Sequence, residues 1–348
     1  MDAVTLTRQL VDIESITGNE AAVGNYLYGE LCRLGYHTRK MPVEGERFNL
    51  YATAEGGGSE AKAGNDASDA AFPLIVFSTH MDTVPPFIAS SEDATRIYGR
   101  GSCDAKGIIA AQIAAAERLR QEKIHVGLLF VVGEERDSLG AKVANEFIGN
   151  QHARSRRYLV NGEPTENRMA LASKGTLRVE ITATGKMAHS AYPELGESAI
   201  DKLLEALARL RAMALPSDPE VGACTLNIGL IEGGRAPNVI ADYAHADLLY
   251  RLVGPSEDLR RRIVATAGGQ VRVTFPLEIP FLRLRAVEGL PTMIAAFTTD
   301  VPFLTNWGEA LLVGPGSIHV AHTEGEYIEK GQLAEAIDLY CALARKLR

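Results

Sequence analysis

Three short apolar segments, each followed by acidic or imidazole side chains, constrain the fold of this chain more than any other feature. They occupy residues 73–78, 125–132 and 157–161, and helix-forming segments separate them at 106–121 and 138–148. Short apolar runs without polar alternation are typical of strands buried on both faces of a sheet. Alternating strands and helices predict a mostly parallel sheet with right-handed crossovers, so the expected fold class is α/β.

The side chains that follow these strands, together with two more distant ones, are of the kinds that bind divalent metal ions. They are His80, Asp104, Glu134, Glu135, Glu163 and His322. Because open α/β sheets place their sites at the carboxyl ends of strands, we expect these side chains to converge on one crevice. Imidazoles and carboxylates in this combination are the ligand set of a two-metal hydrolytic site. Without metal ions, so many acids in one crevice would repel one another and raise some of their pKa values.

Two pairs of nearby residues indicate how this site is organised. Alternate residues of an extended segment point the same way, so Asp82 lies beside His80 and can fix which ring nitrogen is free. Adjacent residues face opposite ways, so one of Glu134 and Glu135 can bind metal while the other reaches a bound water. The residues alone leave open which carboxylate takes which part.

The pattern of the chain changes at about residue 173 and changes back at about residue 281. Between these points the expected elements run strand, helix, strand, strand, helix, strand, at 175–184, 197–213, 225–232, 243–252, 257–267 and 271–277. This order is typical of a compact two-layer α+β module of the ferredoxin-like kind. We therefore expect one domain formed by residues 1–172 and 281–348, and a second domain inserted at 173–280.

Outside that module, further local patterns predict elements of the first domain. Thr17 or Asn19 is expected to cap a helix that stops at Gly35. The glycine-rich polar segment 55–69 is expected to form an exposed loop. After residue 281 we expect a helix at 290–297, a strand at 310–313 and a closing helix at 332–347.

Length and charge limit the kind of protein that this sequence can encode. A chain of 348 residues is longer than one ordinary hydrophobic core supports. Its net charge of −8 argues against a nucleic-acid or anionic-membrane partner and fits a cytoplasmic enzyme. We expect neither a secretion signal nor a membrane span, because no segment has the necessary apolar length. The four cysteines are widely scattered, which predicts free thiols in a reducing compartment.

Four segments resemble the signatures of the M20 metallopeptidases, a family that includes acetylornithine deacetylase, succinyl-diaminopimelate desuccinylase, aminoacylase and carboxypeptidase G2. They are HMDTVP at 80–85, GRGSCDAKG at 99–107, GEE at 133–135 and GEPT at 162–165. The resemblance continues in order to the GPG segment at 314–316 and to His322. It implies a zinc-peptidase-like catalytic domain, an inserted dimerisation (lid) domain and a homodimer.

The resemblance also implies a role for each metal-binding residue. It makes His80 and Glu163 ligands of one zinc ion, Glu135 and His322 ligands of the other, and Asp104 the bridge between them. The peptide bond after Asp104 would be cis, and Asp82 would orient His80. Cobalt(II) or manganese(II) would suit the same ligands.

Further roles implied by the resemblance concern catalysis and substrate binding. Glu134 would be the general base and acid. His189, in the inserted domain, would stabilise the oxyanion in the partner subunit's site. Asn238 and Gly316 would lie near the substrate, and Arg251 would bind its carboxylate.

The segment 314–328 is most similar to acetylornithine deacetylases, and the short chain is also similar to hydrolases of acetyl-lysine or carrier-protein-linked lysine. The expected reaction is removal of an N-acyl group from a small substrate, N-acetylornithine or N-acetyl-lysine, in arginine or lysine biosynthesis. The alternatives are desuccinylation of succinyl-diaminopimelate and di- or carboxypeptidase activity. A non-catalytic binding protein with the same fold is a remote alternative, against which the intact ligands and Glu134 argue.

Several polar residues near these motifs have an ordinary structural interpretation. His319 precedes His322 by three residues and is left out of the site. Cys103, beside Asp104, is expected only to fill space. Glu324 and Glu326 are expected to be solvated residues before the last helix, with support of the metal ligands as the alternative.

Overall fold

The computed structural model describes residues 2–54, 72–149 and 157–348, so the loop expected at 55–69 lies outside the described residues. Contacts between Cα atoms divide the chain into two compact units. Unit 1 comprises Met1–Leu171, Leu284–Met293 and Thr299–Arg348, and unit 2 comprises Ala172–Arg283 and Ile294–Thr298. The segment Ile294–Thr298, expected in the first domain, belongs to unit 2 because its carbonyls accept hydrogen bonds from Lys174 N (2.9 Å) and Ser173 Oγ (2.7 Å).

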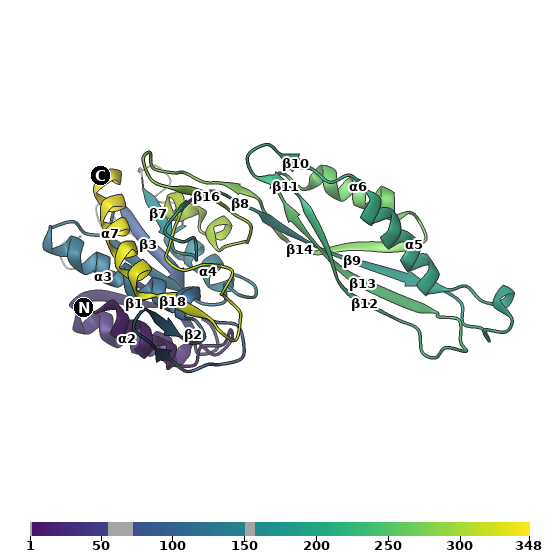
Figure 1. Cartoon of the computed structure of the whole chain (residues 1–348), viewed down its shortest axis with the longest axis horizontal. Coiled ribbons are helices and arrows are strands. Elements are labelled where there is room, and N and C mark those ends of the chain that lie inside the picture. The colour runs from purple at the N-terminus through teal and green to yellow at the C-terminus, as the bar shows by residue number, and fades with distance from the viewer. Residues whose placement is uncertain (1, 55–71, 150–156) are drawn as a thin grey trace. The chain divides into compact units, whose positions relative to one another are not determined.

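The centre of unit 1 is a six-stranded sheet in the order β1-β2-β6-β3-β7-β17 (Figure 1). Its strands are β1 (Tyr36–Glu44), β2 (Arg47–Ala54), β3 (Ile75–His80), β6 (Gly127–Val131), β7 (Tyr158–Asn161) and β17 (Glu309–Leu312). The last four pair in parallel, which confirms the predicted mostly parallel sheet. β1 and β2 add an antiparallel edge. The sequence does not predict β1, because its polar and largely exposed residues form no apolar run.

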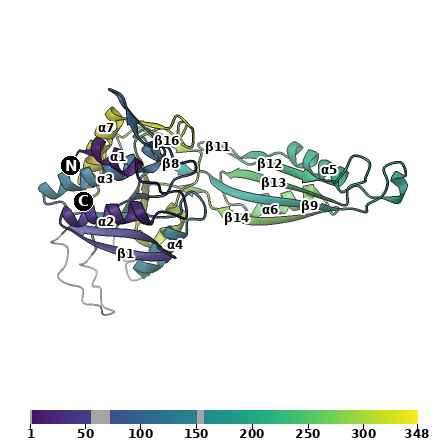
Figure 2. The same ribbon diagram turned by 90° about the horizontal axis from the view of Figure 1, so that it is seen from below.

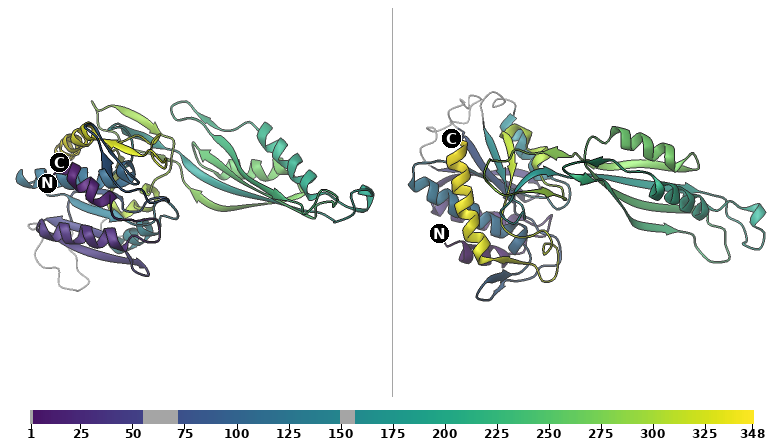
Figure 3. Two further views of the ribbon diagram at one scale, coloured as in Figure 1. Left: turned by 60° about the horizontal axis from the view of Figure 1, so that its bottom comes forward. Right: turned by 45° about the horizontal axis from the view of Figure 1, so that its top comes forward.

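Helices cover both faces of this sheet (Figure 2). One face carries α1 (Ala3–Val11), α2 (Ala21–Arg33), α3 (Gly107–Gln121) and α7 (Lys330–Leu347); the other carries α4 (Leu139–Ile148), η5 (Val301–Phe303) and η6 (Thr305–Trp307). Adjacent residues of β6 alternate between two hydrophobic clusters, with Leu128 and Phe130 on the α3 side and Leu129 and Val131 on the α4 side. Figure 3 shows α7 lying across the first face. Burial on both faces explains why these strands read as uninterrupted apolar runs.

The remaining elements outside the inserted module are short. β4 (Ser91–Glu92), β5 (Arg96–Tyr98) and β18 (Tyr327–Glu329) form a three-stranded sheet, and η2 (Ser102–Lys106) is a kinked turn before α3. The helix expected at 290–297 is wrong. That segment contains strand β16 (Thr292–Ala295), which belongs to a three-stranded sheet with β8 (Met169–Ser173) and β15 (Leu282–Arg283). Strand pairing therefore overrides the local helical pattern.

Helix α2 begins after Glu20 rather than after Thr17 or Asn19 as expected. Glu20 makes no side-chain cap, because its buried carboxylate accepts two hydrogen bonds from Arg47 at 2.8 Å. A long-range ion pair thus replaces the predicted local cap.

Unit 2 is a two-layer α+β module with a four-stranded antiparallel sheet in the order β12-β13-β9-β14. Its main elements are β9 (Gly175–Thr184), α5 (Ala199–Ala212), β12 (Thr225–Gly233), β13 (Tyr243–Leu252), α6 (Glu257–Ala267) and β14 (Val271–Ile279). Three minor elements are η4 (Pro193–Leu195), β10 (Ser217–Asp218) and β11 (Gly222–Ala223). Helices α5 and α6 lie on the same face of the sheet (Figure 1). The order of elements confirms the predicted ferredoxin-like arrangement.

Two further expectations concern the whole chain. Within the described ranges, no helix combines the length and apolar character needed to cross a membrane. The four cysteines are free, and three of them are buried.

Candidate metal centre

His80 is the last residue of β3, and its ring is buried, with 1% of the residue exposed. Its Nδ1 lies 3.0 Å from the main-chain oxygen of Asp82, and its Nε2 lies 2.9 Å from Asp104 Oδ1. Burial lowers the pKa of His80, but the hydrogen bonds to Asp104 and Asp82 outweigh it and raise the pKa well above its ordinary value. In the neutral ring, donation from Nδ1 to the carbonyl leaves the lone pair on Nε2, which faces Asp104.

Asp104 lies in the kinked turn before α3, and the peptide bond between Asp104 and Ala105 is cis, as expected. Its two carboxylate oxygens face two histidines. Oδ1 lies 2.9 Å from His80 Nε2, and Oδ2 lies 3.6 Å from His322 Nε2. The buried carboxylate therefore stands between the two imidazoles, one from β3 and one from the loop after β17.

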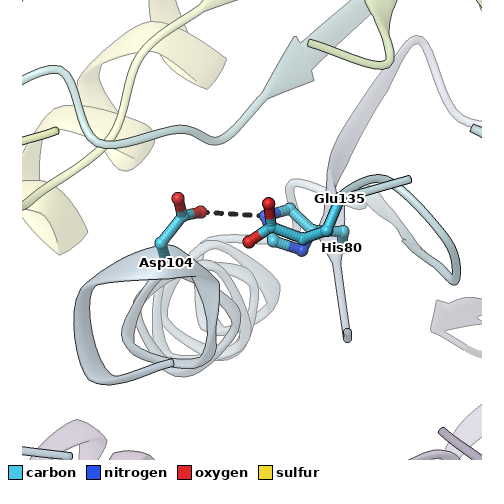
Figure 4. Close-up of side chains that lie close together, drawn as sticks. All are labelled: His80, Asp104 and Glu135. Carbon is cyan, nitrogen blue, oxygen red and sulfur yellow. Dashed lines mark hydrogen bonds and ion pairs between the residues drawn. The ribbon is translucent and has the colours of Figure 1, made fainter. Parts of the chain in front are cut away.

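Glu135 completes a cluster of potential metal ligands with His80 and Asp104. The ligand atoms of His80, Asp104 and Glu135 all lie within 4.8 Å of one another, and Figure 4 shows the Asp104 carboxylate facing the His80 ring with Glu135 beside it. His322 Nε2 lies 2.9 Å from Glu135 Oε1, and this contact raises the pKa of the imidazole. The backbone of His322 has a φ of 64°, a left-handed conformation that non-glycine residues adopt uncommonly and often at functional sites.

Two further acids of the cluster are Glu163, which is buried, and Glu134, which is half-buried. Burial, and then the charge of Glu163, raises the pKa of Glu134 well above its ordinary value. The pKa of Glu163 is also raised well above its ordinary value by burial, with the charge of Asp104 adding to the effect. Glu163 Oε1 is buried and has no hydrogen-bond partner among the described residues. A buried carboxylate oxygen without a donor is costly, so the site lacks positive charge.

Asp300 belongs to this acidic region, although no motif in the sequence marks it. It is 1% exposed at the start of η5, and burial raises its pKa to about 7. The charge of His80 opposes this effect, and that of Asp82 adds to it. No strand-end pattern precedes Asp300 in the sequence, and the segment before it is the one wrongly expected to be helical. Only the three-dimensional arrangement identifies it.

Asp82 connects the ends of β3 and β6. Its carboxylate accepts hydrogen bonds from Glu134 N at 3.1 Å and Glu135 N at 3.2 Å. Thr17, an expected helix cap, donates its hydroxyl to the same carboxylate at 2.8 Å. The carboxylate lies farther from His80 Nδ1, at 3.5 Å, than the main-chain oxygen does. Asp82 therefore orients the ring chiefly through its carbonyl and uses its carboxylate to hold the Glu134–Glu135 turn.

Gly316 lies in a tight turn beside the cluster. Its φ is 88°, and a Cβ atom there would lie 2.5 Å from Cys103 Sγ, so both conformation and space require glycine. Its N–H donates to Gln332 Oε1 at 2.9 Å, and its carbonyl accepts from Glu166 N at 2.8 Å. These contacts give Gly316 a structural role; its contact with substrate stays a prediction. Cys103 is buried, as expected of a residue that fills space.

The remaining predicted residues lie in unit 2. The exposed His189 accepts a hydrogen bond at Nδ1 from Ala191 N at 3.1 Å, which leaves the proton of the neutral ring on Nε2. Asn238 is also exposed. Arg251, on β13, is partly buried and donates to Thr176 Oγ1 at 2.7 Å. Burial lowers the pKa of Arg251, and within the described residues no carboxylate pairs with it. The roles of these three residues stay predictions.

The donor set of the cluster fits divalent cations. Carboxylates and imidazoles are the ligands that zinc, cobalt and manganese share. Added positive charge would pair with the unpartnered oxygen of Glu163. It would also lower the raised pKa values of Glu134 and Glu163. The cluster is therefore a candidate site for more than one metal ion.

Comparison with known proteins gives three kinds of similarity. Residues 171–267 match a family model described as a peptidase dimerisation domain. The chain is 36% identical over 349 residues to a "peptidase M20 domain-containing protein" of Schizosaccharomyces pombe, with 97% of this chain and 82% of the relative covered. A "probable carboxypeptidase" of Aspergillus terreus is 37% identical over 373 residues, with 96% and 83% covered. A solved tripeptidase structure from Staphylococcus aureus has a TM-score of 0.78 at 22% identity and covers 99% of this chain and 98% of its own, which shows the same fold.

Proposed function

The chain belongs to the peptidase M20 family, and from this premise we propose that it hydrolyses N-acyl amino acids with two bound divalent metal ions. Membership of the family makes the protein a metal-dependent hydrolase of amide bonds. The observation that carries the proposal is the convergence of His80, Asp104 and Glu135, whose ligand atoms lie within 4.8 Å of one another.

The proposed metal ions are zinc. His80 and Glu163 would hold one ion, Glu135 and His322 would hold the other, and Asp104 would bridge them. The two oxygens of Asp104 face the two histidines at 2.9 and 3.6 Å, which supports the bridge. When bound, such ions supply Lewis-acid chemistry that polarises a carbonyl group and lowers the pKa of water. Cobalt(II) and manganese(II) suit the same ligands.

Glu134 is the proposed general base and acid. Burial and neighbouring acids raise its pKa in the metal-free protein, and a carboxylate at this position can accept a proton and return it. Asp82 Oδ1 fixes the main chain at Glu134 through the 3.1 Å hydrogen bond from Glu134 N. The Glu134 carboxylate would take a proton from the attacking water and deliver it to the nitrogen of the leaving amine.

His189 is the proposed donor to the oxyanion. Because its Nδ1 accepts the Ala191 N–H, the neutral ring carries its proton on Nε2 and can donate there. Charge that develops on the former carbonyl oxygen is stabilised by such a fixed donor.

Arg251 supports a substrate with a free carboxylate. Its guanidinium group is partly buried, and within the described part of the chain its recorded partner is the neutral hydroxyl of Thr176. A partly desolvated cation without an anion gains more than an exposed one from a charged ligand. In N-acyl amino acids, and at the C-terminal bond of a peptide, a free carboxylate lies next to the amide bond that would be cleaved.

Two kinds of acyl group are compatible with a carboxylate on the leaving amino acid. The segment 314–328 favours an acetyl group on ornithine or lysine, in arginine or lysine biosynthesis. The similarity to a probable carboxypeptidase of Aspergillus terreus favours a peptidyl group and hence carboxypeptidase activity. Both reactions release an amino acid with a free carboxylate, so they share one bond type and differ only in the acyl side.

We also propose a cytoplasmic homodimer formed through unit 2. The matched dimerisation model covers most of this unit. The edge strand β12 exposes Leu230 and Ile231, and an unpaired apolar edge suits association with a second copy. The four free cysteines fit a reducing compartment.

The decisive experiment is a substrate panel with metal-reconstituted protein. The panel contains N-acetylornithine, N-acetyl-lysine, N-succinyl-diaminopimelate and simple dipeptides, each paired with its carboxamide in place of the carboxylate next to the scissile bond. We expect hydrolysis of at least one carboxylate substrate and a large loss on its carboxamide counterpart. If no member of the panel is cleaved, the proposal is contradicted. Equal rates on both members of a pair would contradict the role of Arg251.

A further inference from the structure

We propose that Glu326 is a positioning residue that holds the turn carrying Asp104 and thereby sets the affinity of both metal ions; this rests on the proposed two-metal function. The expectation that Glu326 is solvated is wrong, because the residue is 1% exposed. Its neighbour Glu324 is exposed, as expected. The two acids lie two residues apart in one loop, so their different environments must reflect specific contacts.

One oxygen of Glu326 accepts three main-chain hydrogen bonds from the turn around Asp104. The donors to Oε1 are Gly101 N at 2.9 Å, Cys103 N at 3.2 Å and Asp104 N at 3.2 Å. The last of these is the backbone nitrogen of the proposed bridging ligand itself. A single carboxylate oxygen thus holds the segment 101–104 in place through three of its main-chain N–H groups.

The second oxygen of Glu326 completes the arrangement. Oε2 accepts a hydrogen bond from Arg100 Nη1 at 2.6 Å, and both side chains of this ion pair are almost fully buried. The main-chain oxygen of Glu326 accepts Gly99 N at 3.0 Å, which attaches the same loop to the start of the turn. Another buried cation, Lys106, donates to Ile13 O at 2.7 Å. Arg100 is therefore the cation that pairs with the Glu326 carboxylate.

These contacts affect the binding of both metal ions because Asp104 is the proposed ligand of both. Its main-chain N–H donates to the Glu326 carboxylate, and its two side-chain oxygens face His80 and His322. A small shift of the turn would move both oxygens at once. Residues that hold metal ligands in place typically affect metal affinity by about 10- to 100-fold. We therefore expect loss of Glu326 to weaken both metal-binding steps together.

The substitution Glu326→Gln separates this role from simple space filling. An amide has nearly the same shape as a carboxylate but only one acceptor oxygen. If that oxygen faces the three N–H groups, the NH2 group faces Arg100; if the amide turns over, the NH2 group faces the N–H groups. Neither orientation satisfies all the donors. Glu324→Gln makes the same chemical change at an exposed position and serves as the matched control.

The test is a calorimetric titration of zinc into metal-free wild type, E326Q and E324Q, with circular dichroism to verify folding. We expect two zinc ions per wild-type chain, both binding steps weakened about 10- to 100-fold in E326Q, and E324Q within about threefold of wild type. Absorption bands of bound cobalt(II) should change in E326Q and not in E324Q. E326D, which keeps the charge but shortens the reach, replaces E326Q in the same test if E326Q does not fold.

The possible outcomes distinguish this inference from the proposed function. Folded E326Q with wild-type zinc affinity would overturn the positioning role and leave the two-metal site intact. Weakening of one step only would also overturn it, because a shift of Asp104 must affect both ions. A wild-type chain that binds no zinc, cobalt or manganese would instead overturn the proposed function itself.

Discussion

In unit 1 the carboxylate of Glu163, which follows β7, is buried and pairs with no cation among the described residues, whereas in unit 2 Asp247, on the open face of the sheet, is partly exposed and paired. Glu163 Oε1 has no hydrogen-bond partner among the described residues, and burial raises the pKa values of Glu134 and Asp300. In unit 2, by contrast, Asp247 pairs with Arg178 at 3.1 Å, and about half of the Arg178 side chain is exposed.

This difference indicates where each unit interacts with ligands. A buried charge without a partner is costly, and a fold that retains several of them has a compensating ligand. Partly exposed pairs such as the one at Asp247 contribute little to stability. Arg251 is the exception in unit 2, since it is partly buried with no carboxylate among the described residues. A buried or partly buried charged group without a partner of opposite charge, such as Glu163 in unit 1 or Arg251 in unit 2, therefore distinguishes a proposed functional position from an ordinary ion pair.

The strongest test of the comparison is Glu134→Gln. The change removes the proposed proton carrier but keeps the size of the side chain, so turnover should fall by about 10²- to 10⁴-fold. Metal content should stay at the wild-type value, because Glu134 is not a proposed ligand. Steady-state kinetics and elemental analysis check the two parts. Turnover within a few-fold of wild type would remove Glu134 from the mechanism.

The second test concerns the buried charge of Asp300 in the metal-free protein. Its folded pKa of about 7 lies above its ordinary value of 3.8, so the folded state holds a proton that the unfolded state has already released. The contribution of Asp300 to stability therefore falls as pH rises from about 4 to 7. Asp300→Asn cannot ionise and should be more stable than wild type at pH 8, by up to about 3–4 kcal/mol.

That gain should disappear near pH 4, where the wild-type carboxyl is protonated in the folded state. Urea unfolding at both pH values, in the presence of a chelator, measures the difference. The charge of Asp300 also helps to raise the pKa values of Glu134 and Glu163, so the measured difference includes relief of these two acids. An equal stability difference at the two pH values would show that Asp300 is not a buried, strained charge.

The third test addresses the unbalanced cation of unit 2. Arg251→Ala should raise KM for a carboxylate substrate by about 10- to 100-fold, because a hydrogen bond to a charged group is worth about 1.5–3 kcal/mol. KM for the matching carboxamide should change little. Arg178→Ala, which removes an arginine that already has a carboxylate partner, is the control. Equal effects of the two substitutions would weaken the distinction between paired and unpaired cations.

The smallest effect is expected at Asp247. Asp247→Asn breaks a partly exposed pair and should change the free energy of unfolding by less than about 1 kcal/mol. Catalytic constants should remain at wild-type values. Thermal unfolding and the substrate assay check both. A loss as large as that expected at Asp300 would mean that the two units do not differ in the way described here.

Much of the fold can be predicted from the sequence where burial imposes a simple pattern of apolar residues. Strands β3, β6 and β7 are apolar because both of their faces are covered, and the shared direction of β3 and β6 brings His80 and Glu135 together. Asp104 joins them from the turn before α3. Strand β1 has no such pattern, because it is polar and largely exposed. The segment 290–297 has a helical pattern but forms a strand, because pairing with a distant part of the chain decides its conformation.

The parts of the site that depend on long-range contacts are harder to predict. Glu326 stands in a polar loop, and only the fold shows that it faces the turn around Asp104. Thr17 is a plausible helix cap by its local sequence but binds Asp82 instead. Asp300 follows no motif. Residues that bind metal have recognisable neighbours in sequence, whereas the residues that support them do not.

The most direct measurement is anomalous diffraction from crystals grown with zinc. We predict two peaks in unit 1, one about 2 Å from the nearest atoms of His80 and Glu163 and the other about 2 Å from those of Glu135 and His322. Both peaks should lie next to Asp104. Crystals with zinc in solution but no anomalous peak among these side chains would contradict the account.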